Sequence, residues 1–132
     1  MKTSFGAIML CLAASQALAD EKVLYCTDTT ALGIKWDDTG NASPARFLSN
    51  RYSIKIISSS ERVITEMAGG SADVPERFEC KQSHHQVISC SDESGLEAWA
   101  FSDNKYTRAF LYGAPVGGDP NIVVAYGVCT AF

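Results

Sequence analysis

Hydrophobic and polar residues alternate along much of the chain, as expected of β-strands with one face toward a core and the other toward water. Tyr52, Ile54 and Ile56 fall on one face, for example, while Ser53 and Lys55 fall on the other. Similar runs recur at close intervals between turn-forming residues, which indicates short antiparallel strands. The predicted strands are 22–27, 31–36, 51–57, 62–67, 77–82, 86–91, 97–101, 106–112 and 121–130.

This spacing of strands is typical of a small antiparallel up-and-down barrel or a sandwich. We therefore predict an all-β domain of about eight or nine short strands. Trp99 and Phe101 are expected to lie across from three residues of a neighbouring strand, Tyr106, Arg108 and Phe110, in an aromatic cross-strand patch. Within the last predicted strand the run 122–126 is apolar without alternation, so we expect it to be central or covered on both faces.

One segment, 59–68, fits two structures. Residues 58–61 have the spacing of a helix capping box, and Gly69-Gly70 could end a helix. Residues 63–65 are all β-branched, which favours a strand. We predict a strand here.

The first 19 residues have the features of a secretory signal peptide. Lys2 precedes an apolar run, and the small-residue tripeptide Ala17-Leu18-Ala19 precedes a charged segment. We predict cleavage after Ala19, which leaves one domain of residues 20–132. No segment is long and apolar enough to span a bilayer, so no membrane insertion is expected after cleavage. The predicted location is the periplasm or the extracellular medium.

Four cysteines follow the signal peptide, and an even number in an exported chain indicates two disulfides. Cys80 and Cys90 flank a predicted turn between two strands, so they are expected to pair across one hairpin. Cys26 then pairs with Cys129, which ties the first strand to the last. A zinc site is the alternative, but no C-x-x-C spacing is present and an oxidising compartment disfavours it.

The chain is acidic, with 11 Lys and Arg against 15 Asp and Glu and a net charge of −4 at pH 7. It has no basic cluster that could bind a phosphate backbone, so no nucleic-acid partner is expected. No nucleophile elbow, metalloprotease motif or phosphate-binding loop is found, and no cofactor is expected. The sequence favours a non-catalytic protein and leaves open an enzyme whose catalytic residues are distant in sequence.

Two groups of residues near predicted turns are candidates for binding. His84 and His85 lie at the expected tip of the disulfide-linked hairpin, where they would be weak candidates for a metal site. Polar turn residues without a ligand are the alternative, because a third metal ligand is missing. Trp36, Asp37 and Asp38 begin the long predicted loop 37–50 and could bind a sugar or a cation, although acids in turns are common.

A third candidate is the glycine- and proline-rich loop 113–121, which contains Gly117, Gly118 and Asp119. Glycine and proline give this loop a defined shape, and shaped loops often carry binding functions. A phosphate-binding role is disfavoured because a predicted strand, not a helix, follows the loop.

The general plan, an exported chain with cysteines in its first and last strands, is similar to that of small periplasmic β-barrel inhibitors of lysozyme. The resemblance covers the plan and not the motifs. Those inhibitors use a Ser-Gly-containing loop, which Gly69-Gly70-Ser71-Ala72 does not reproduce. No functional residue is therefore carried over.

Two functional hypotheses follow. The first is a non-catalytic binding or inhibitor module that displays its loops to an extracytoplasmic protein or a cell-envelope ligand. The second is a small-ligand or metal-binding barrel, or an enzyme, whose interior is lined by Trp36, Trp99 and Tyr106. The second hypothesis requires a hollow interior, whereas the same aromatic residues packed as a core would fill it.

Overall fold

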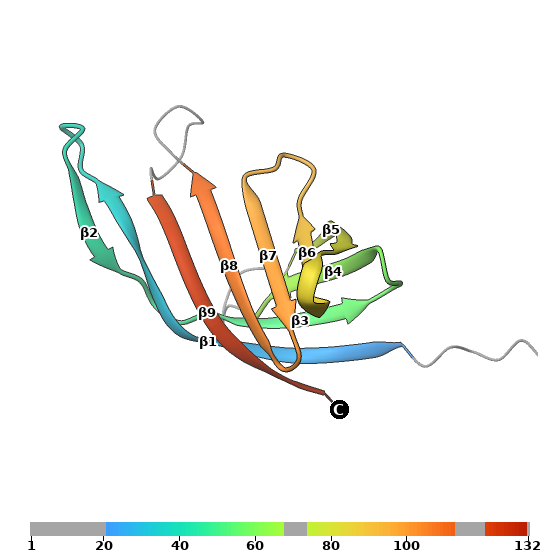
Figure 1. Cartoon of the computed structure of the whole chain (residues 1–132). Coiled ribbons are helices and arrows are strands. Elements are labelled where there is room, and N and C mark those ends of the chain that lie inside the picture. Colours follow the sequence, from blue (N-terminus) through green and yellow to red (C-terminus); the bar gives the residue numbers. More distant parts are fainter. Residues whose placement is uncertain (1–20, 68–73, 113–120, 132) are drawn as a thin grey trace, which may run out of the picture.

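The computed structural model of the chain describes residues 21–67, 74–112 and 121–131, which form nine strands and one short 3₁₀ helix (Figure 1). None of the described residues forms a helix long and apolar enough to cross a membrane. The predicted all-β class is confirmed. In chain order the elements are β1 (Lys22–Trp36), β2 (Ala42–Arg46), β3 (Arg51–Ile56), β4 (Glu61–Glu66), β5 (Pro75–Gln82), η1 (His84–Gln86), β6 (Ile88–Ser91), β7 (Glu97–Ser102), β8 (Lys105–Tyr112) and β9 (Asn121–Ala131).

Eight of the strands close into an antiparallel barrel in the order β1-β3-β4-β5-β6-β7-β8-β9, and β9 returns to pair with β1. The pairing of β1 with β9 runs from Leu24 opposite Ala131 to Lys35 opposite Asn121. Closure of this kind removes the unpaired strand edges that promote aggregation. The hairpin of β1 and β2 continues the wall beyond the barrel, at the upper left of Figure 1.

β1 is one strand of 15 residues, whereas the sequence pattern predicts two. The register against β9 shifts between Asp28 and Thr30, which marks a β-bulge. Asp28 and Ala31 are both buried although they are three residues apart. The inward-facing positions are therefore even-numbered before the bulge and odd-numbered after it. The period-two pattern breaks at this point, and the break imitates the end of a strand.

The predicted loop 37–50 is also wrong in part, because it contains β2. β2 has the sequence Ala-Ser-Pro-Ala-Arg, which has little intrinsic preference for a strand. It pairs with Leu32–Trp36 of β1, whose edge continues past the point where β3 ends its pairing. The ambiguous segment 59–68 contains β4, so the predicted strand is confirmed there.

Both predicted disulfides are confirmed. Cys26–Cys129 joins β1 to β9, and Cys80–Cys90 joins β5 to β6. The two strand pairs that they join are four strands apart around the barrel. One half of the barrel, made of β1, β3, β4 and β5, is therefore linked by a disulfide to the other half, β6 to β9, at each of its two edges. Two intramolecular disulfides suit an oxidising, extracytoplasmic environment.

Aromatic side chains fill the middle of the barrel. The ring of Trp99 meets Tyr52 edge to face at 4.9 Å between centroids and stacks on Phe101 at 5.8 Å. The predicted cross-strand contacts are confirmed for Tyr106 and Arg108, which lie opposite Phe101 and Trp99 in the pairing of β7 with β8. Phe110 lies opposite Glu97 instead. Arg62 is also buried, with its guanidinium 4.0 Å from the centre of the Phe101 ring.

The last strand fulfils one of its two predicted alternatives. β9 is central in the sheet, between β8 and β1, as expected. Its outward side chains Val124, Tyr126 and Val128 are 45–55% exposed, so of the two alternatives the central position is confirmed and cover on both faces is not found. The alternation was hidden because apolar residues occupy both faces.

Candidate functional site

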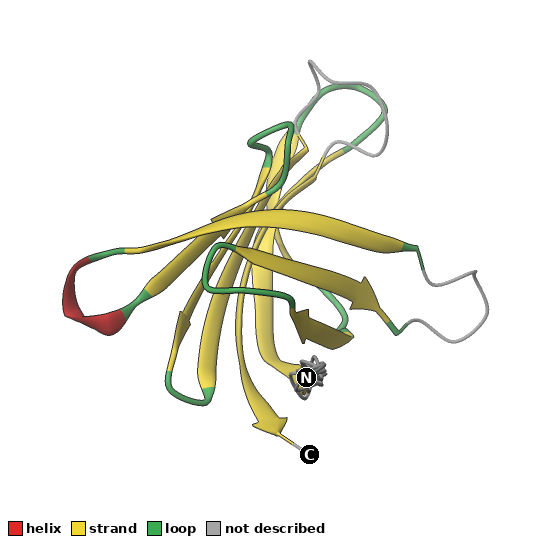
Figure 2. Ribbon diagram, turned by 90° about the vertical axis from the view of Figure 1, so that its right-hand side faces the viewer, coloured by secondary structure: helices red, strands yellow, loops and turns green. Residues whose placement is uncertain are grey.

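One end of the barrel holds a cavity of about 500 Å³, within the size range of small-molecule sites. We call this the open end; there β4 and β8 finish and β5, β7 and β9 start. Apolar walls come from Phe47, Ile64, Phe110 and Val123. The other end, which carries the β5–β6 hairpin and the β7–β8 turn, is called the hairpin end; Figure 2 shows η1 in red at the tip of that hairpin.

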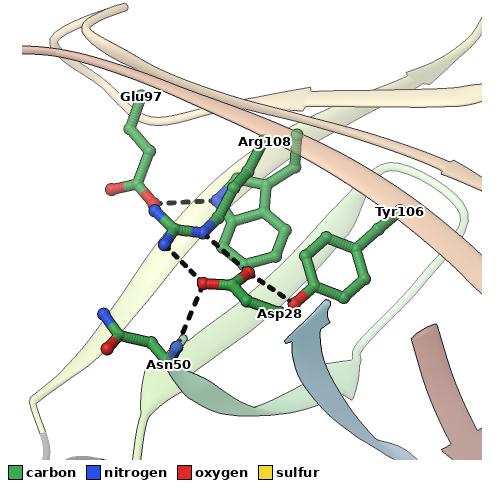
Figure 3. A network of polar contacts seen from close by, with 6 residues as sticks. Asp28, Asn50, Glu97, Tyr106 and Arg108 are labelled. Carbon is green, nitrogen blue, oxygen red and sulfur yellow. Dashed lines mark hydrogen bonds and ion pairs between the residues drawn. The ribbon is translucent and has the colours of Figure 1, made fainter. Parts of the chain in front are cut away.

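Arg108 of β8 lies at the floor of the cavity, where it forms a buried ion pair with Asp28 of β1 (Figure 3). The Asp28 carboxylate is fully buried and the Arg108 side chain is 8% exposed. Arg108 Nη2 donates to Asp28 Oδ2 at 2.7 Å and Arg108 Nε donates to Oδ1 at 3.2 Å. This two-pronged geometry is the strongest form of a guanidinium–carboxylate contact.

Two more donors complete the coordination of Asp28. The Tyr106 hydroxyl donates to Oδ1 at 2.8 Å, and the backbone N–H of Asn50 donates to Oδ2 at 3.1 Å. The backbone N–H of Asp28 in turn donates to the Asn50 carbonyl at 2.9 Å. These bonds join the bulge of β1 to the segment between β2 and β3, which contains Asn50. Asp28 therefore holds this segment at the side of the cavity.

Protonation of this network is fixed around neutral pH. Burial lowers the pKa of Arg108, but the hydrogen bonds to Asp28 together with the electrostatic attraction of Tyr52, Asp28 and Glu97 outweigh it, and the pKa rises above its ordinary value. Burial and the hydrogen bond to Asp28 raise the pKa of Tyr106. The guanidinium therefore stays charged and the phenol stays neutral, which makes the floor polar but without net charge.

Gly127 of β9 makes room for this network. It lies opposite both Asp28 and Tyr106 in the strand pairing. A Cβ atom at Gly127 would be 2.2 Å from the Thr27 carbonyl oxygen and 2.5 Å from the Tyr106 hydroxyl oxygen. A side chain at this position would therefore displace either β1 or the tyrosine that bonds Asp28.

Three carboxylates line the cavity above the floor: Glu66, Glu76 and Glu97. Each occupies an inward-facing position at the open end of its strand, because side chains two residues apart on a strand lie on the same face. The buried neighbours two residues away are Ile64, Phe78 and Trp99, respectively. Arg108 lies between Asp28 and Glu97 (Figure 3). Since Asp28 compensates Arg108, the remaining charge of these lining residues is negative.

Glu97 is the most enclosed of the three carboxylates. Its Oε1 accepts a hydrogen bond of 2.8 Å from Trp99 Nε1. Burial raises the pKa of Glu97 and the nearby Glu76 raises it further, against the lowering effect of the Trp99 bond. Glu97 therefore gains its negative charge at a higher pH than an ordinary glutamate.

Those residues selected from sequence that the structure describes do not line this cavity. His84 and His85 are exposed in η1 at the hairpin end, and no group of three metal-ligating side chains forms among the described residues. Asp37 accepts hydrogen bonds from the Thr39 hydroxyl at 2.6 Å and the Asn41 backbone N–H at 2.9 Å, which lower its pKa and shape the β1–β2 turn.

Other selected residues belong to different parts of the chain. Trp36 ends β1 and Asp38 is exposed in the turn that follows. Trp99 and Tyr106 belong to the packed core below the cavity. Three sets lie outside the described residues: the predicted signal peptide; the run Gly69–Ala72; and the loop residues Gly117, Gly118 and Asp119.

Sequence reasoning did not predict the cavity, although it named two of its lining residues, Arg108 and Phe110, as members of a cross-strand patch. Asp28 follows the predicted strand 22–27 by one position and resembles the first residue of a turn. Asp28 nevertheless keeps the inward phase of Cys26, and the bulge comes only after it. The three glutamates could have been found by extending the inward phase of each strand by two residues.

Comparisons with models of protein families, with curated proteins and with solved structures give no match for this chain. The described residues define a class by geometry alone: a disulfide-linked, eight-stranded antiparallel barrel with an acidic and apolar cavity at one end.

Proposed function

We propose that this protein is a non-catalytic binding module whose cavity takes up a cationic group carried on an apolar body. The observation that carries this proposal is the composition of the cavity, in which apolar walls lie beside three carboxylates: the half-buried Glu97 and the exposed Glu66 and Glu76. Arg108, the cation among the described lining residues, is already paired with Asp28. An anionic ligand would meet net negative charge, whereas a cation would find an uncompensated partner.

The cavity offers two kinds of favourable contact to such a ligand. Phe47, Phe110 and Val123 would bury its apolar part, which contributes about 25 cal/mol for each Å² removed from water. Glu76 and Glu97 would accept hydrogen bonds from the cationic head, and bonds to charged groups contribute about 1.5 to 3 kcal/mol.

The same chemistry can come from two sources. A free alkylammonium compound would occupy the cavity alone, whereas a lysine or arginine side chain would bring an extracytoplasmic protein with it. The second source joins the cavity to the hypothesis of a protein-binding or inhibitor module. Both sources share the cationic head and the apolar stem.

Calorimetric titration of the disulfide-bonded protein with hexylammonium, hexanol and hexanoate tests the charge requirement. A short lysine-rich peptide is the fourth probe. We expect hexylammonium or the peptide to bind, and hexanol and hexanoate to bind at least tenfold more weakly or not at all. Binding of the peptide alone would assign the cation to a protein partner. Equal binding of hexanol or hexanoate, or no binding by either cation, would overturn the proposal.

Variants connect the binding to the cavity. Glu76→Gln and Glu97→Gln should each weaken cation binding by about 1 to 2 kcal/mol, or about 5- to 30-fold. Glu79→Gln is the matched control, since Glu79 lies on the same strand as Glu76 with its exposed side chain on the outer face. Equal effects of all three changes would contradict a site in the cavity.

The pH dependence is a further test. Because the pKa of Glu97 is raised, acidification should weaken cation binding at a higher pH than expected for an ordinary carboxylate. Titrations repeated between neutral and acidic pH should show this step in the unmodified protein and lose it in Glu97→Gln.

A further inference from the structure

Two arginines are buried in the described part of the barrel, and they differ in their partners. Arg108, toward the open end, is paired with Asp28. Arg62, the second residue of β4, lies toward the hairpin end and is 6% exposed. Its Nη1 atom has no hydrogen-bond partner, and none of the ion pairs between described residues includes it. Arg62 is therefore a buried cation without an anion, which is a costly arrangement.

The contact that Arg62 does make leaves its hydrogen-bonding capacity unused. Its guanidinium lies 4.0 Å from the centre of the Phe101 ring. An aromatic face attracts a cation but is no substitute for the oxygen acceptors that guanidinium N–H groups require. Burial lowers the pKa of Arg62, whereas attraction to Asp28 helps to raise that of Arg108. The two sites differ by one carboxylate, and at Arg62 its place is open to a ligand.

A second cation belongs to the same row of the sheet as Arg62. Lys22 of β1 lies opposite Ile56 of β3, and Ile56 lies opposite Arg62. Directly opposed residues share a face of the sheet, so Lys22 occupies an inward-facing position like Arg62. With strands about 4.8 Å apart, the two backbones are about 10 Å from each other, a gap that two long side chains can bridge. A ligand entering at the hairpin end could therefore contact both cations.

Polar but uncharged residues occupy the neighbouring inward positions at this end. Ser60 lies opposite the buried Cys80, to which its carbonyl is hydrogen bonded, and Gln82 follows Cys80 by two residues on β5. Both are exposed. Of the acids near this end, Glu21 is already in an ion pair and Asp103 is exposed in the β7–β8 turn. The described inward positions here thus offer positive charge and hydrogen-bond donors, the reverse of the cavity at the open end.

We propose that the hairpin end of the barrel is a second binding site, in which Arg62 and Lys22 hold a phosphate group. A phosphate group carries a charge of about −1.5 to −2 at neutral pH, which matches two cations. Two of its oxygens can accept parallel N–H bonds from one guanidinium, and Ser60 and Gln82 can donate to the others. The site is at the opposite end of the barrel from the proposed cation site and does not depend on it.

Calorimetric titration of the disulfide-bonded protein with inorganic phosphate, and with chloride at the same ionic strength, tests this directly. We expect phosphate to bind and chloride to bind more weakly, because chloride cannot accept two parallel N–H bonds. Arg62→Met should weaken phosphate binding about 10- to 100-fold. Lys22→Gln should weaken it about 2- to 5-fold, since Lys22 is exposed.

Arg77→Met is the matched control and should leave phosphate binding unchanged, because Arg77 is an exposed arginine already paired with Glu61. An equal loss in Arg77→Met would overturn the proposal. Equal binding of chloride, or no binding of phosphate by the unmodified protein, would also overturn it. Glycerol phosphate distinguishes the source of the group: tighter binding than inorganic phosphate supports a phosphate ester, and weaker binding supports the free ion.

Two further measurements separate binding from a structural role of Arg62. Phosphate should raise the melting temperature of the unmodified protein more than that of Arg62→Met, whereas general salt effects would raise both alike. Should Arg62→Met fail to fold, Arg62→Lys keeps the charge but loses the two-pronged geometry, and should still weaken phosphate binding. Nuclear magnetic resonance of the Arg62 Nε–H group should show a shift on addition of phosphate. An unchanged signal would overturn the proposal.

Discussion

At the hairpin end of the barrel the inward positions hold Cys26, Cys80 and Phe101, which pack into a continuous core. At the open end the inward positions of the same sheet hold Glu66, Glu76 and Glu97, which line a cavity. The backbone alternation is the same at both ends. An inward position therefore becomes core or cavity according to the side chain placed there, and on β4, β5 and β7 burial falls toward the glutamate at the open end.

Asp28 and Arg108 separate the two regions. Their paired charges form a polar layer between the aromatic core and the carboxylate-lined cavity. Arg62 is the exception within the packed region, because its cation lies on the Phe101 ring and one guanidinium nitrogen has no hydrogen-bond partner among the described residues. Burial lowers the pKa of Arg62 accordingly.

This contrast predicts that the effect of a substitution on stability decreases from the packed region to the cavity. The largest effect is expected for loss of the Cys26–Cys129 disulfide by Cys26→Ala with Cys129→Ala. The bond spans 103 residues, and chain-entropy estimates give about 5 kcal/mol for it against about 3 kcal/mol for Cys80–Cys90, which spans 10. Urea unfolding of the two double variants measures the difference. An equal or larger loss for Cys80–Cys90 would contradict the entropic ranking.

The next largest effect is expected at the boundary, from Asp28→Ala. The change leaves the buried Arg108 cation without its partner, which typically costs 3 to 5 kcal/mol. Adding Arg108→Met to Asp28→Ala should recover more than half of the loss, since the unpaired charge is then removed. Urea unfolding of both variants decides this, and a double variant no more stable than Asp28→Ala would show that the charge is not the cause.

Much of the packed region could be predicted from sequence because its signals are local or covalent. Alternation locates most strands, and the spacing of Cys80 and Cys90 around a turn leads to both disulfides. The single strand β1 and the short strand β2 could not be predicted. A bulge breaks the alternation in the first, and in the second a free edge of β1 imposes a strand on residues that do not favour one.

The cavity was harder to predict for a different reason. Glu66, Glu76 and Glu97 lie at strand ends, where an acidic residue is equally compatible with solvent, a turn or the mouth of a barrel. These positions line a cavity only because the sheet closes into a barrel, and closure depends on the pairing of β1 with β9. Asp28 and Arg108 are 80 residues apart in sequence, so their contact depends on the register of β1 against β9 and of β9 against β8.

Gly127→Ala should have an intermediate effect. The added methyl group overlaps the Thr27 carbonyl and the Tyr106 hydroxyl, and overpacking of this kind costs about 1 to 3 kcal/mol. A Gly127→Ala/Tyr106→Phe double variant tests the cause, because removing the hydroxyl relieves part of the overlap. Thermal unfolding should show a smaller loss from Gly127→Ala in the Tyr106→Phe background. An identical loss in both backgrounds would assign the strain to β1 alone.

The smallest effect, with the opposite sign, is expected for Glu97→Gln in the cavity. A carboxyl whose pKa is raised in the folded state favours folding when protonated, and that contribution is lost as pH rises through the folded pKa. At neutral pH the buried charge therefore opposes folding, and Gln, which can still accept the Trp99 hydrogen bond, should stabilise the protein by a few tenths of a kcal/mol. Below the pKa the gain should vanish. Thermal unfolding of both proteins across this pH range measures it, and a loss of stability at neutral pH would mean that the Glu97 charge supports the fold and does not merely line the cavity.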